Sequence, residues 1–238
     1  MPKANEILDN NDVSDNLYVN MYPSYIKNNF IKKVYTILSI QLIATVGIAS
    51  IFTFNIYTRM WILSNPYIVP LNLLLSVFIL CPLFAYKKNY PINLALLSAF
   101  TLSESILVSY ICAQYYENGM GTLILYSIAT TSFVFLSMTA YTCCTRQDFK
   151  FLEVGLSIGT IFLLGSGLVF LFIPTVGIEI FITAGGCILF CGYILYDTSE
   201  IMNYMEPDDA IVASVQLYLD IINLFLYILQ CLRIFDND

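Results

Sequence analysis

The chain has 238 residues, of which 58% are hydrophobic and only 11% are charged, and it contains no histidine. Its mean hydropathy of +0.76 lies well above the soluble range and indicates a membrane protein. The formal net charge of −7 argues against nucleic acid as a partner, and the lack of histidine excludes Ser-His-Asp and Cys-His catalysis.

Residues 1–29 carry several acidic and amide side chains but few large apolar ones. This composition predicts a disordered acidic tail. No basic segment followed by a short apolar core is found there, so we expect no cleavable signal peptide and a first span that acts as its own insertion signal.

Residues 30–238 are expected to form one all-α transmembrane domain, because apolar runs long enough to cross about 30 Å of hydrocarbon recur along it. We predict seven spans, near residues 34–54, 67–86, 92–116, 119–142, 152–173, 176–202 and 211–235. An alternative topology has six spans and a re-entrant C-terminal helix. Residues 221–235 would extend ~22 Å if helical, enough to complete a crossing, which favours the seven-helix bundle.

The distribution of lysine and arginine predicts a cytosolic N-terminus, because cytoplasmic segments carry an excess of these residues. Only Arg59 and Arg233 fall on the opposite side. Eight basic residues fall on the N-terminal side, namely Lys3, Lys27, Lys32, Lys33, Lys87, Lys88, Arg146 and Lys150.

Acidic residues within the spans are the candidate functional residues, since ionisable groups in a bilayer are costly and mark ion or proton pathways. No lysine or arginine is predicted deep in any span. Glu104 and Glu200 are candidates to line a pathway, although a glutamate near a span end has the simpler interpretation of exposure to the interface. The acidic candidates are Glu104, Glu153, Glu179, Asp197, Glu200 and Asp220.

Asp197 and Asp220 are expected to form a pair. They lie equally far from the centre of the turn between the last two spans, so an antiparallel hairpin brings them to one depth, roughly 15 Å from the turn. Gln216, Asp220 and Asn223 form a polar stripe on one helix face. Two carboxyl groups in a low dielectric tend to share a proton, which predicts a pH-sensing dyad and a transient Ca²⁺ site.

The turn between these spans contains Glu206, Asp208 and Asp209, around Pro207. No lysine or arginine lies in the same loop. We therefore expect this cytosolic acidic turn to gather cations near the pathway.

Four segments resemble the transmembrane Bax inhibitor motif family, and most of all its Golgi anti-apoptotic branch, also called lifeguard 4. They are "FIKKVYTILSIQL" (30–42), "KKNYPINLALLSAFTLSES" (87–105), "FCGYILYDT" (190–198) and "LYLDIINLFLYIL" (217–229). The resemblance covers roughly residues 30–235, and the spacing of the last two motifs is its most specific part.

The resemblance implies a bundle with the last helix central, and a pH-sensitive Ca²⁺-permeable leak in Golgi and endoplasmic-reticulum membranes. Such a leak lowers stored Ca²⁺ and restrains apoptosis. It implies that Asp197 and Asp220 latch the last two helices, and that Asp208 matches a functionally implicated glutamate. Prokaryotic relatives place an arginine in the second span that engages the dyad, whereas residues 67–86 contain no basic residue.

Two other functions compete with the leak channel. A non-conducting adaptor would bind Ca²⁺-release channels or apoptotic regulators, and a homo-oligomer is compatible with either function. An intramembrane aspartyl protease also pairs aspartates on adjacent helices, but it needs Gly-x-Gly-Asp where this chain has Leu217-Tyr-Leu-Asp220. We therefore expect no enzyme and no cofactor, with Ca²⁺ as the permeant ion and the bilayer and protons as partners.

Overall fold

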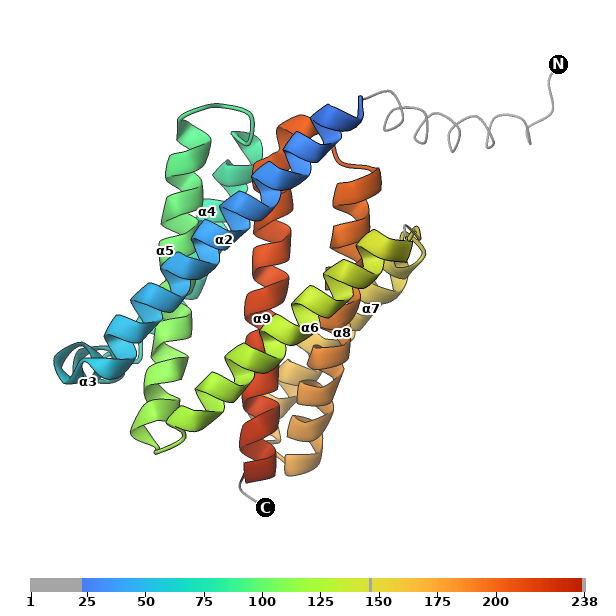
Figure 1. Ribbon diagram of the computed structural model, residues 1–238. Helices are drawn as coiled ribbons and strands as arrows, with labels where there is room; N and C mark the ends of the chain where they lie inside the picture. Colours follow the sequence, from blue (N-terminus) through green and yellow to red (C-terminus); the bar gives the residue numbers. More distant parts are fainter. Residues whose placement is uncertain (1–22, 146, 237–238) are drawn as a thin grey trace.

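The computed structural model describes residues 23–145 and 147–236 (Figure 1). Most of the predicted acidic tail therefore lies outside the described residues, as do Lys3 and Arg146 of the topology argument. The described part is helical apart from its connections. Its elements are α2 (Ser24–Phe54), α3 (Ile56–Leu63), α4 (Ile68–Ala85), α5 (Ile92–Glu117), α6 (Gly121–Thr145), α7 (Leu152–Phe172), α8 (Val176–Asn203), the 3₁₀ turn η1 (Pro207–Asp209) and α9 (Ala210–Asp236).

Seven helices in the described part are long and apolar enough to cross a membrane, which confirms the predicted bundle. The last of them, α9, is a continuous helix of 27 residues that runs the length of the bundle (Figure 1). It is not re-entrant, so the six-span alternative is wrong. The reason is in the sequence, because neither proline nor glycine interrupts 210–236.

Two elements differ from the sequence prediction. The first helix begins at Ser24, ten residues before the predicted span, because its polar first turns continue the same helix beyond the apolar run. The short helix α3 was not predicted. Asn55 caps it by accepting a hydrogen bond from the backbone N–H of Tyr57 at 3.0 Å, and Tyr57 and Trp61 are exposed on it, as in helices that lie in a membrane interface.

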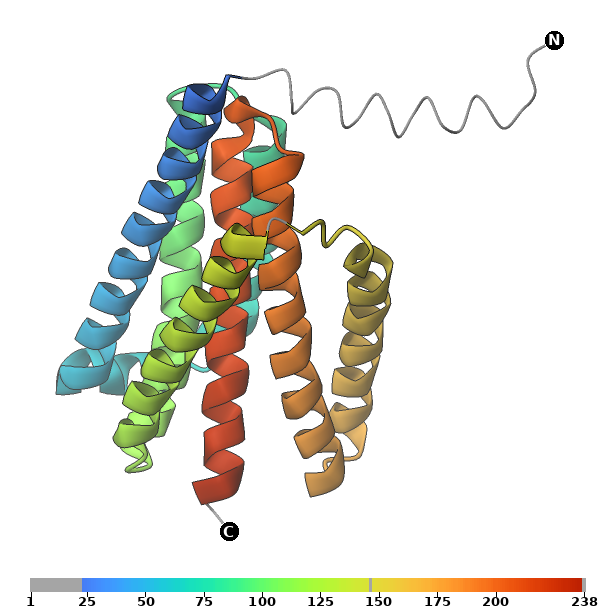
Figure 2. The same cartoon turned by 45° about the vertical axis from the view of Figure 1, so that its right-hand side comes forward.

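The helices alternate in direction, so their connections gather at two ends (Figures 1 and 2). We call the end where α2 begins the N-terminal end; the α4–α5 and α8–α9 connections also lie there. We call the end where α9 finishes the C-terminal end; α3 and the α5–α6 connection lie there. The α6–α7 connection faces the N-terminal end but lies nearer the middle of the bundle in both views.

Helix α9 is the centre of the bundle, as the family resemblance implied. In its most apolar stretch 67% of the residues are buried, against 39% or less in the other spans. Helices α2, α6 and α8 pack directly against α9, α4 packs on α5, and α7 packs on α8. With only 6% of its apolar stretch buried, α7 exposes most of its side chains to the surroundings.

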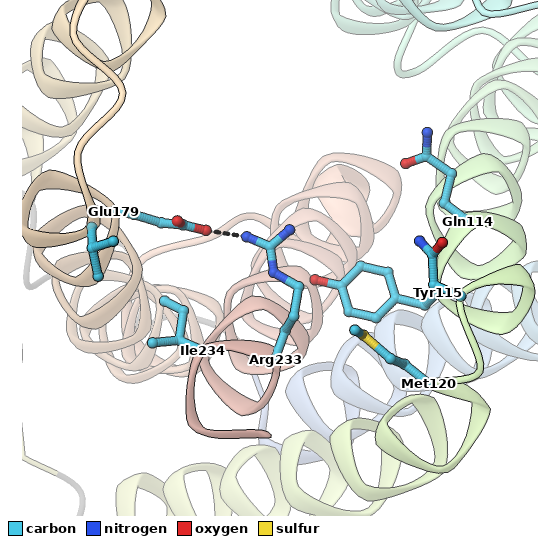
Figure 3. Close-up of a pocket in the computed structure, with 8 residues that line it drawn as sticks. Gln114, Tyr115, Met120, Glu179, Arg233 and Ile234 are labelled. Carbon is cyan, nitrogen blue, oxygen red and sulfur yellow. Dashed lines mark hydrogen bonds and ion pairs between the residues drawn. The ribbon is translucent and has the colours of Figure 1, made fainter. Parts of the chain in front are cut away.

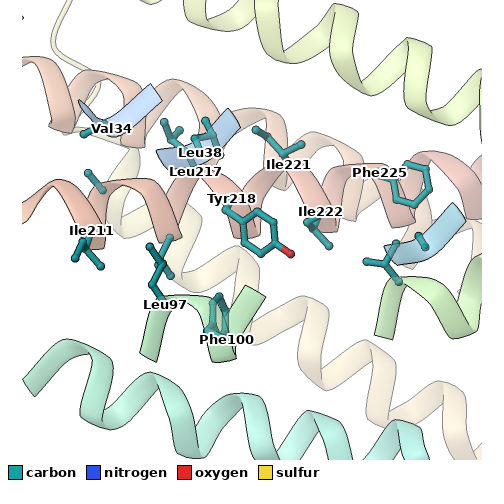
Figure 4. Close-up of a cluster of buried hydrophobic side chains, with 14 of the residues drawn as sticks. Val34, Leu38, Leu97, Phe100, Ile211, Leu217, Tyr218, Ile221, Ile222 and Phe225 are labelled. Atoms are coloured by element: carbon teal, nitrogen blue, oxygen red, sulfur yellow. The ribbon is translucent and has the colours of Figure 1, made fainter. Parts of the chain in front are cut away.

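Close packing around Tyr218 of α9 forms the main core (Figure 4). The ring of Tyr218 meets Phe100 of α5 edge-on, with centroids 6.2 Å apart, and Leu38 of α2 is buried in the same cluster. Because lipid tails are as apolar as these side chains, this core is held mainly by packing contacts and interhelical hydrogen bonds.

Buried hydroxyl groups add such hydrogen bonds between α2, α5 and α9. The hydroxyl groups of Thr45 and Tyr218 are 2.8 Å apart, and Ser105 donates to Thr45 at 3.1 Å. Hydrogen bonds of this kind contribute on average ~0.6 kcal/mol each in membrane bundles. The core is therefore fixed in register around α9, the helix that carries Asp220.

Candidate functional site: a buried carboxyl pair in the last helical hairpin

The hairpin of α8 and α9 positions the candidate site, and these two helices form the most extensive contact in the fold. Pro207 opens the 3₁₀ turn between them, and the N–H of Asp209 donates to the carbonyl of Glu206 at 3.0 Å. Proline fits such a first position because it has no N–H to leave unsatisfied. The tight turn keeps α8 and α9 antiparallel and in fixed register.

The structure brings Asp197 of α8 and Asp220 of α9 together. Each is 5% exposed, and their carboxyl groups lie within hydrogen-bonding distance of each other. Oδ2 of Asp220 is buried, and no N–H or O–H donor of the described residues reaches it. Two ionised carboxylates have no hydrogen to place between them, so this contact requires a proton on one of the two.

No lysine or arginine in residues 23–145 and 147–236 forms an ion pair with either aspartate. The acidic group that acts on the pair from nearby is Glu200, one turn along α8. Negative charge at this depth must therefore be balanced by protons, water or mobile cations rather than by a fixed side chain. The arrangement allows proton sharing and weak cation binding.

The predicted polar stripe of α9 faces α8 in part. Gln216 donates to Oε2 of Glu200 at 3.4 Å, one helical turn from the dyad toward the N-terminal end. Asn223, toward the other end, donates to the carbonyl of Leu219 in its own helix at 2.8 Å. Glu200 is thus near the dyad, together with Gln216, while Asn223 bonds within its own helix.

The α6–α7 connection packs against α8 close to the dyad. The N–H of Phe149 donates to Oγ of Ser199 at 3.2 Å, and Ser199 donates to the carbonyl of Gln147 at 3.3 Å. Tyr204 also donates a hydrogen bond to Asp148. Ser199 lies two residues from Asp197 and therefore on another face of α8, so this recessed connection reaches the depth of the dyad along α8 without facing it.

Glu104 lies in a different polar cluster, between α4 and α5. It is a hydrogen-bond partner of Ser76, whose hydroxyl lies 2.9 Å from that of Ser103. Asn72 donates to the carbonyl of Ser103 at 2.5 Å. Glu104 acts electrostatically on Tyr218 but does not reach the dyad, so the structure does not join it to the other candidates.

Two lysines of the α4–α5 connection pair with the acidic turn. Lys87 lies 2.7 Å from Asp209 and Lys88 lies 3.1 Å from Glu206. The hydrogen bond to Glu206 raises the pKa of Lys88 above its usual value of 10.5. Asp208 has no ion pair within the described ranges. The turn is therefore a charge-paired contact between two loops more than a free acidic surface, a pairing that the sequence hid because its partners lie about 120 residues apart.

A polar cavity of about 580 Å³ lies at the C-terminal end, between α5, α8 and α9 (Figure 3). Arg233 extends across it and forms an ion pair with Glu179, which also accepts a hydrogen bond from Gln230 at 3.3 Å. Tyr115 faces Arg233 from the opposite wall (Figure 3). Glu179 was expected to be exposed at the interface, and the structure gives it an arginine partner from the end of α9.

A resident metal site is not found among the described residues, where no group of three or more His, Cys, Asp or Glu side chains could hold an ion. The dyad offers two carboxyl groups, whereas Ca²⁺ usually takes about six to eight oxygen ligands. Such a site suits an ion that keeps most of its water and stays briefly. The predicted transient Ca²⁺ binding at Asp197 and Asp220 stays a prediction.

The fold and the buried carboxyl pair identify a multi-pass α-helical membrane protein whose central last helix carries a buried carboxyl group. The family described as "Inhibitor of apoptosis-promoting Bax1" matches residues 27–237, and the chain belongs to this Bax inhibitor family. The motifs quoted from the sequence had indicated the same family.

Curated relatives cover nearly the whole chain. The chain is 32% identical over 210 residues to the Golgi anti-apoptotic protein of Vaccinia virus (strain Lister), covering 88% of this chain and 87% of that protein. It is 35% identical over 209 residues to protein lifeguard 4 of Mus musculus, covering 88% and 86%. It is 36% identical over 227 residues to protein LIFEGUARD 3 of Arabidopsis thaliana, covering 90% and 89%.

Proposed function

We propose that this protein is a pH-sensitive Ca²⁺-permeable leak channel of Golgi and endoplasmic-reticulum membranes, which lowers stored Ca²⁺ and thereby inhibits apoptosis. The observation that carries the proposal is the buried contact of Asp197 with Asp220 between α8 and α9, where no lysine or arginine of the described residues forms an ion pair with either aspartate. Relatives named Golgi anti-apoptotic protein support the location and the anti-apoptotic role.

The proposed orientation puts the N-terminal end of the bundle in the cytosol. Five of the described basic residues lie at that end, in α2 and the α4–α5 connection, and Lys150 lies in the α6–α7 connection that faces it, against Arg59 and Arg233 at the other end. This asymmetry is what the positive-inside rule requires. The dyad then lies about 15 Å from the cytosolic turn, and the cavity crossed by Arg233 opens toward the lumen.

The dyad acts as a latch between α8 and α9 in the proposed mechanism. With one shared proton the two carboxyl groups hold the helices together, and the pathway is closed. Loss of that proton leaves two charges facing each other, which at about 4 Å and an effective dielectric constant of ~20 repel by about 4 kcal/mol. Separation of the helices admits water, and Ca²⁺ can then pass the freed carboxylates.

Polar groups on both sides of the dyad support a continuous route. Toward the cytosol, Glu200 and Gln216 lie one turn away and are joined by a hydrogen bond. Toward the lumen, the cavity of about 580 Å³ is the candidate opening. Glu104 lies off this route.

Ca²⁺ flux into liposomes that contain only the purified protein tests the proposal, measured between pH 6 and pH 8. The wild-type flux should rise with pH. Asp197→Asn and Asp220→Asn should each flatten this dependence, because neither variant can build up two facing charges. Asp220→Asn should also lower the maximal flux.

Glu104→Gln is the matched control, since it removes a half-buried carboxyl group of a neighbouring helix that does not reach the dyad. It should keep the wild-type pH profile. If both dyad variants keep that profile, the pair is structural and the gating mechanism is wrong. A protein without any flux in liposomes would favour the non-conducting adaptor instead.

A further inference from the structure

A large apolar cleft lies between α2 and α6, and α5 and α9 form its floor. Its volume is about 750 Å³, within the range of about 300–1,000 Å³ that is usual for ligand sites. We call it the α2–α6 cleft. Side chains that line it include Val46 and Ala49 of α2, Ile128 and Thr131 of α6, and Ile222 and Phe225 of α9.

The cleft is one bilayer leaflet deep. Its outer lining residues, Phe54, Tyr116 and Gly121, lie where α2 and α5 end and α6 begins, at the C-terminal end of the bundle. Its deep lining residue Thr131 lies ten residues into α6, which is about 15 Å along the helix. Half of a hydrocarbon layer of about 30 Å has the same depth.

The cleft opens sideways, between two helices that expose apolar side chains on either side of it. Ile43 of α2 is 72% exposed and Phe133 of α6 is 72% exposed, although neither lines the cleft. Both helices belong to the seven candidate spans. The molecules that meet this opening are therefore membrane lipids rather than water-soluble ligands.

Charged groups stand at the outer rim of the cleft. Nε of Arg59 bonds Oε2 of Glu117 at 2.8 Å, Nη1 of Arg59 donates to the carbonyl of Thr53 at 2.8 Å, and the guanidinium lies 4.8 Å from the ring centroid of Tyr116. Thr53 and Tyr116 line the cleft. The side chain of Arg59 is only 11% exposed, so the rim offers its guanidinium through a narrow opening. Arginine has five N–H donors, and these contacts use Nε and one N–H of Nη1, which leaves Nη2 for another acceptor.

We propose that the α2–α6 cleft binds one acyl chain of a zwitterionic phospholipid, with the lipid phosphate at Arg59 and the lipid ammonium at Glu117. The depth of the cleft from its rim to Thr131 matches the thickness of one leaflet. The lipid headgroup therefore remains at the interface while the acyl chain fills the cleft. In the proposed orientation this is a lipid of the lumenal leaflet.

Charge complementarity selects this lipid class. A phosphate is the preferred partner of a guanidinium, while Glu117, 44% exposed in its side chain, is available to a cationic group. A sterol has no charge to place at this rim. A purely anionic headgroup would face the Glu117 carboxylate, and a zwitterionic headgroup pairs with both side chains.

Photo-crosslinking of the full chain in phosphatidylcholine liposomes tests the proposal. The probe is phosphatidylcholine with a diazirine near the end of one acyl chain, and its adducts are located by mass spectrometry. Adducts should concentrate on the cleft-lining segments of α2, α6 and α9. Val46→Trp, which fills the cleft, should reduce these adducts about fivefold, equivalent to ~1 kcal/mol, whereas Ile43→Trp should leave them unchanged.

A second pair of variants addresses the opposite wall and guards against misfolding of the first. Ser132→Trp projects from a cleft-lining position of α6, and Phe133→Trp beside it points away from the cleft. Only the former should reduce the adducts. For the headgroup, part of the unlabelled phosphatidylcholine of the liposomes is replaced by diacylglycerol with the same chains. The probe adducts in the cleft should then increase, because diacylglycerol competes with the probe less well, and Arg59→Gln combined with Glu117→Gln should remove this difference.

Four results would overturn the proposal. Adducts spread evenly over lipid-facing helices, α7 included, would mean ordinary solvating lipid. If diacylglycerol competes with the probe as well as phosphatidylcholine does, the proposed headgroup contacts are wrong. If a sterol competes better than phosphatidylcholine, the ligand of the cleft is a sterol. Adducts between two protein chains at these positions, in place of lipid adducts, would make the cleft a contact between copies.

Discussion

Single carboxyl groups in a bilayer interior cost about 2.5–3.5 kcal/mol on insertion scales, so each buried acid must be explained by its neighbours. Asp197 and Asp220 lower this cost by facing each other with a shared proton. Glu104 does so through Ser76, and Glu179 through Arg233. The described part of the chain thus uses an ion pair for Glu179, a hydroxyl partner for Glu104 and a second carboxyl group for each member of the dyad.

Lys88 allows a prediction that separates the cytosolic loop contact from the dyad. Its pKa is raised above 10.5 by the hydrogen bond to Glu206, so the stabilisation from this pair is fully present below pH 10.5 and is lost only as the pH rises through the raised value. Lys88 therefore stays protonated between pH 6 and pH 8. Lys88→Gln should leave the shape of the pH–flux profile unchanged, measured beside wild type in the same liposomes.

A shifted profile in Lys88→Gln would contradict this separation. It would mean that the α4–α5 connection participates in proton sensing, despite its distance from the dyad along α9. The variant Asp220→Asn provides the positive control, because its profile should flatten under the same conditions.

At the scale of helices, the sequence predicted the features that depend on local residue patterns, such as the helix spans and the spacing of residues around a turn. Apolar runs gave the seven spans, and equal spacing from the turn centre between Asp208 and Asp209 gave the meeting of Asp197 with Asp220. It did not predict α3, whose eight residues are too few to show a period, although Asn55 was a visible cap. It also could not pair Lys87 with Asp209 or Glu179 with Arg233, because such contacts depend on helix packing between distant segments.

The contact between the α4–α5 connection and the α8–α9 turn should contribute modestly to stability. Lys87 and Asp209 are partly exposed, with side-chain exposures of 35% and 17%, and pairs of this kind contribute about 0.2–1 kcal/mol. Lys87→Asp should lower the thermal unfolding temperature in detergent by one to a few degrees, on the order expected for such an energy. The swapped double variant, Lys87→Asp with Asp209→Lys, should recover most of the loss.

High salt is the control for this loop contact, since screening weakens exposed ion pairs. The difference between wild type and Lys87→Asp should shrink as ionic strength increases. An equal deficit in the single and swapped variants would show that packing of the loops, rather than their charge pairing, determines the stability.

The ends of α8 and α9 allow a second prediction at this scale. Arg233 reaches into the cavity at the C-terminal end and is paired with Glu179. Arg233→Gln should raise Ca²⁺ flux at low ionic strength, because it leaves Glu179 as an unpaired negative charge at the opening. Glu179→Gln should lower the flux, and both effects should diminish in high salt. Equal flux in the two variants would exclude this cavity from the pathway.

The whole molecule has a distribution of charge that determines which ions it can pass. Most basic residues of the described part lie at the two ends of the bundle, with Lys150 in the recessed α6–α7 connection, while Asp197, Glu200 and Asp220 lie along the α8–α9 contact. The formal net charge of −7 is also negative, like the carboxyl groups along this contact. Lys150 acts on Glu200 from the α6–α7 connection, but no lysine or arginine of the described residues forms an ion pair with Asp197 or Asp220. An anion in the proposed route would therefore meet two carboxyl groups at the dyad.

Conduction should therefore favour cations over anions. Rings or pairs of carboxyl groups select cations in channels because they replace part of the lost hydration of the ion and repel anions. With a gradient of calcium chloride across a planar bilayer, the reversal potential should lie near the Ca²⁺ equilibrium potential, and Asp220→Asn should move it toward zero. Glu104→Gln, off the route, should leave it unchanged. A reversal potential near the chloride value in the wild-type protein would exclude the α8–α9 contact as the permeation route, because no anion could pass two facing carboxyl groups in preference to Ca²⁺.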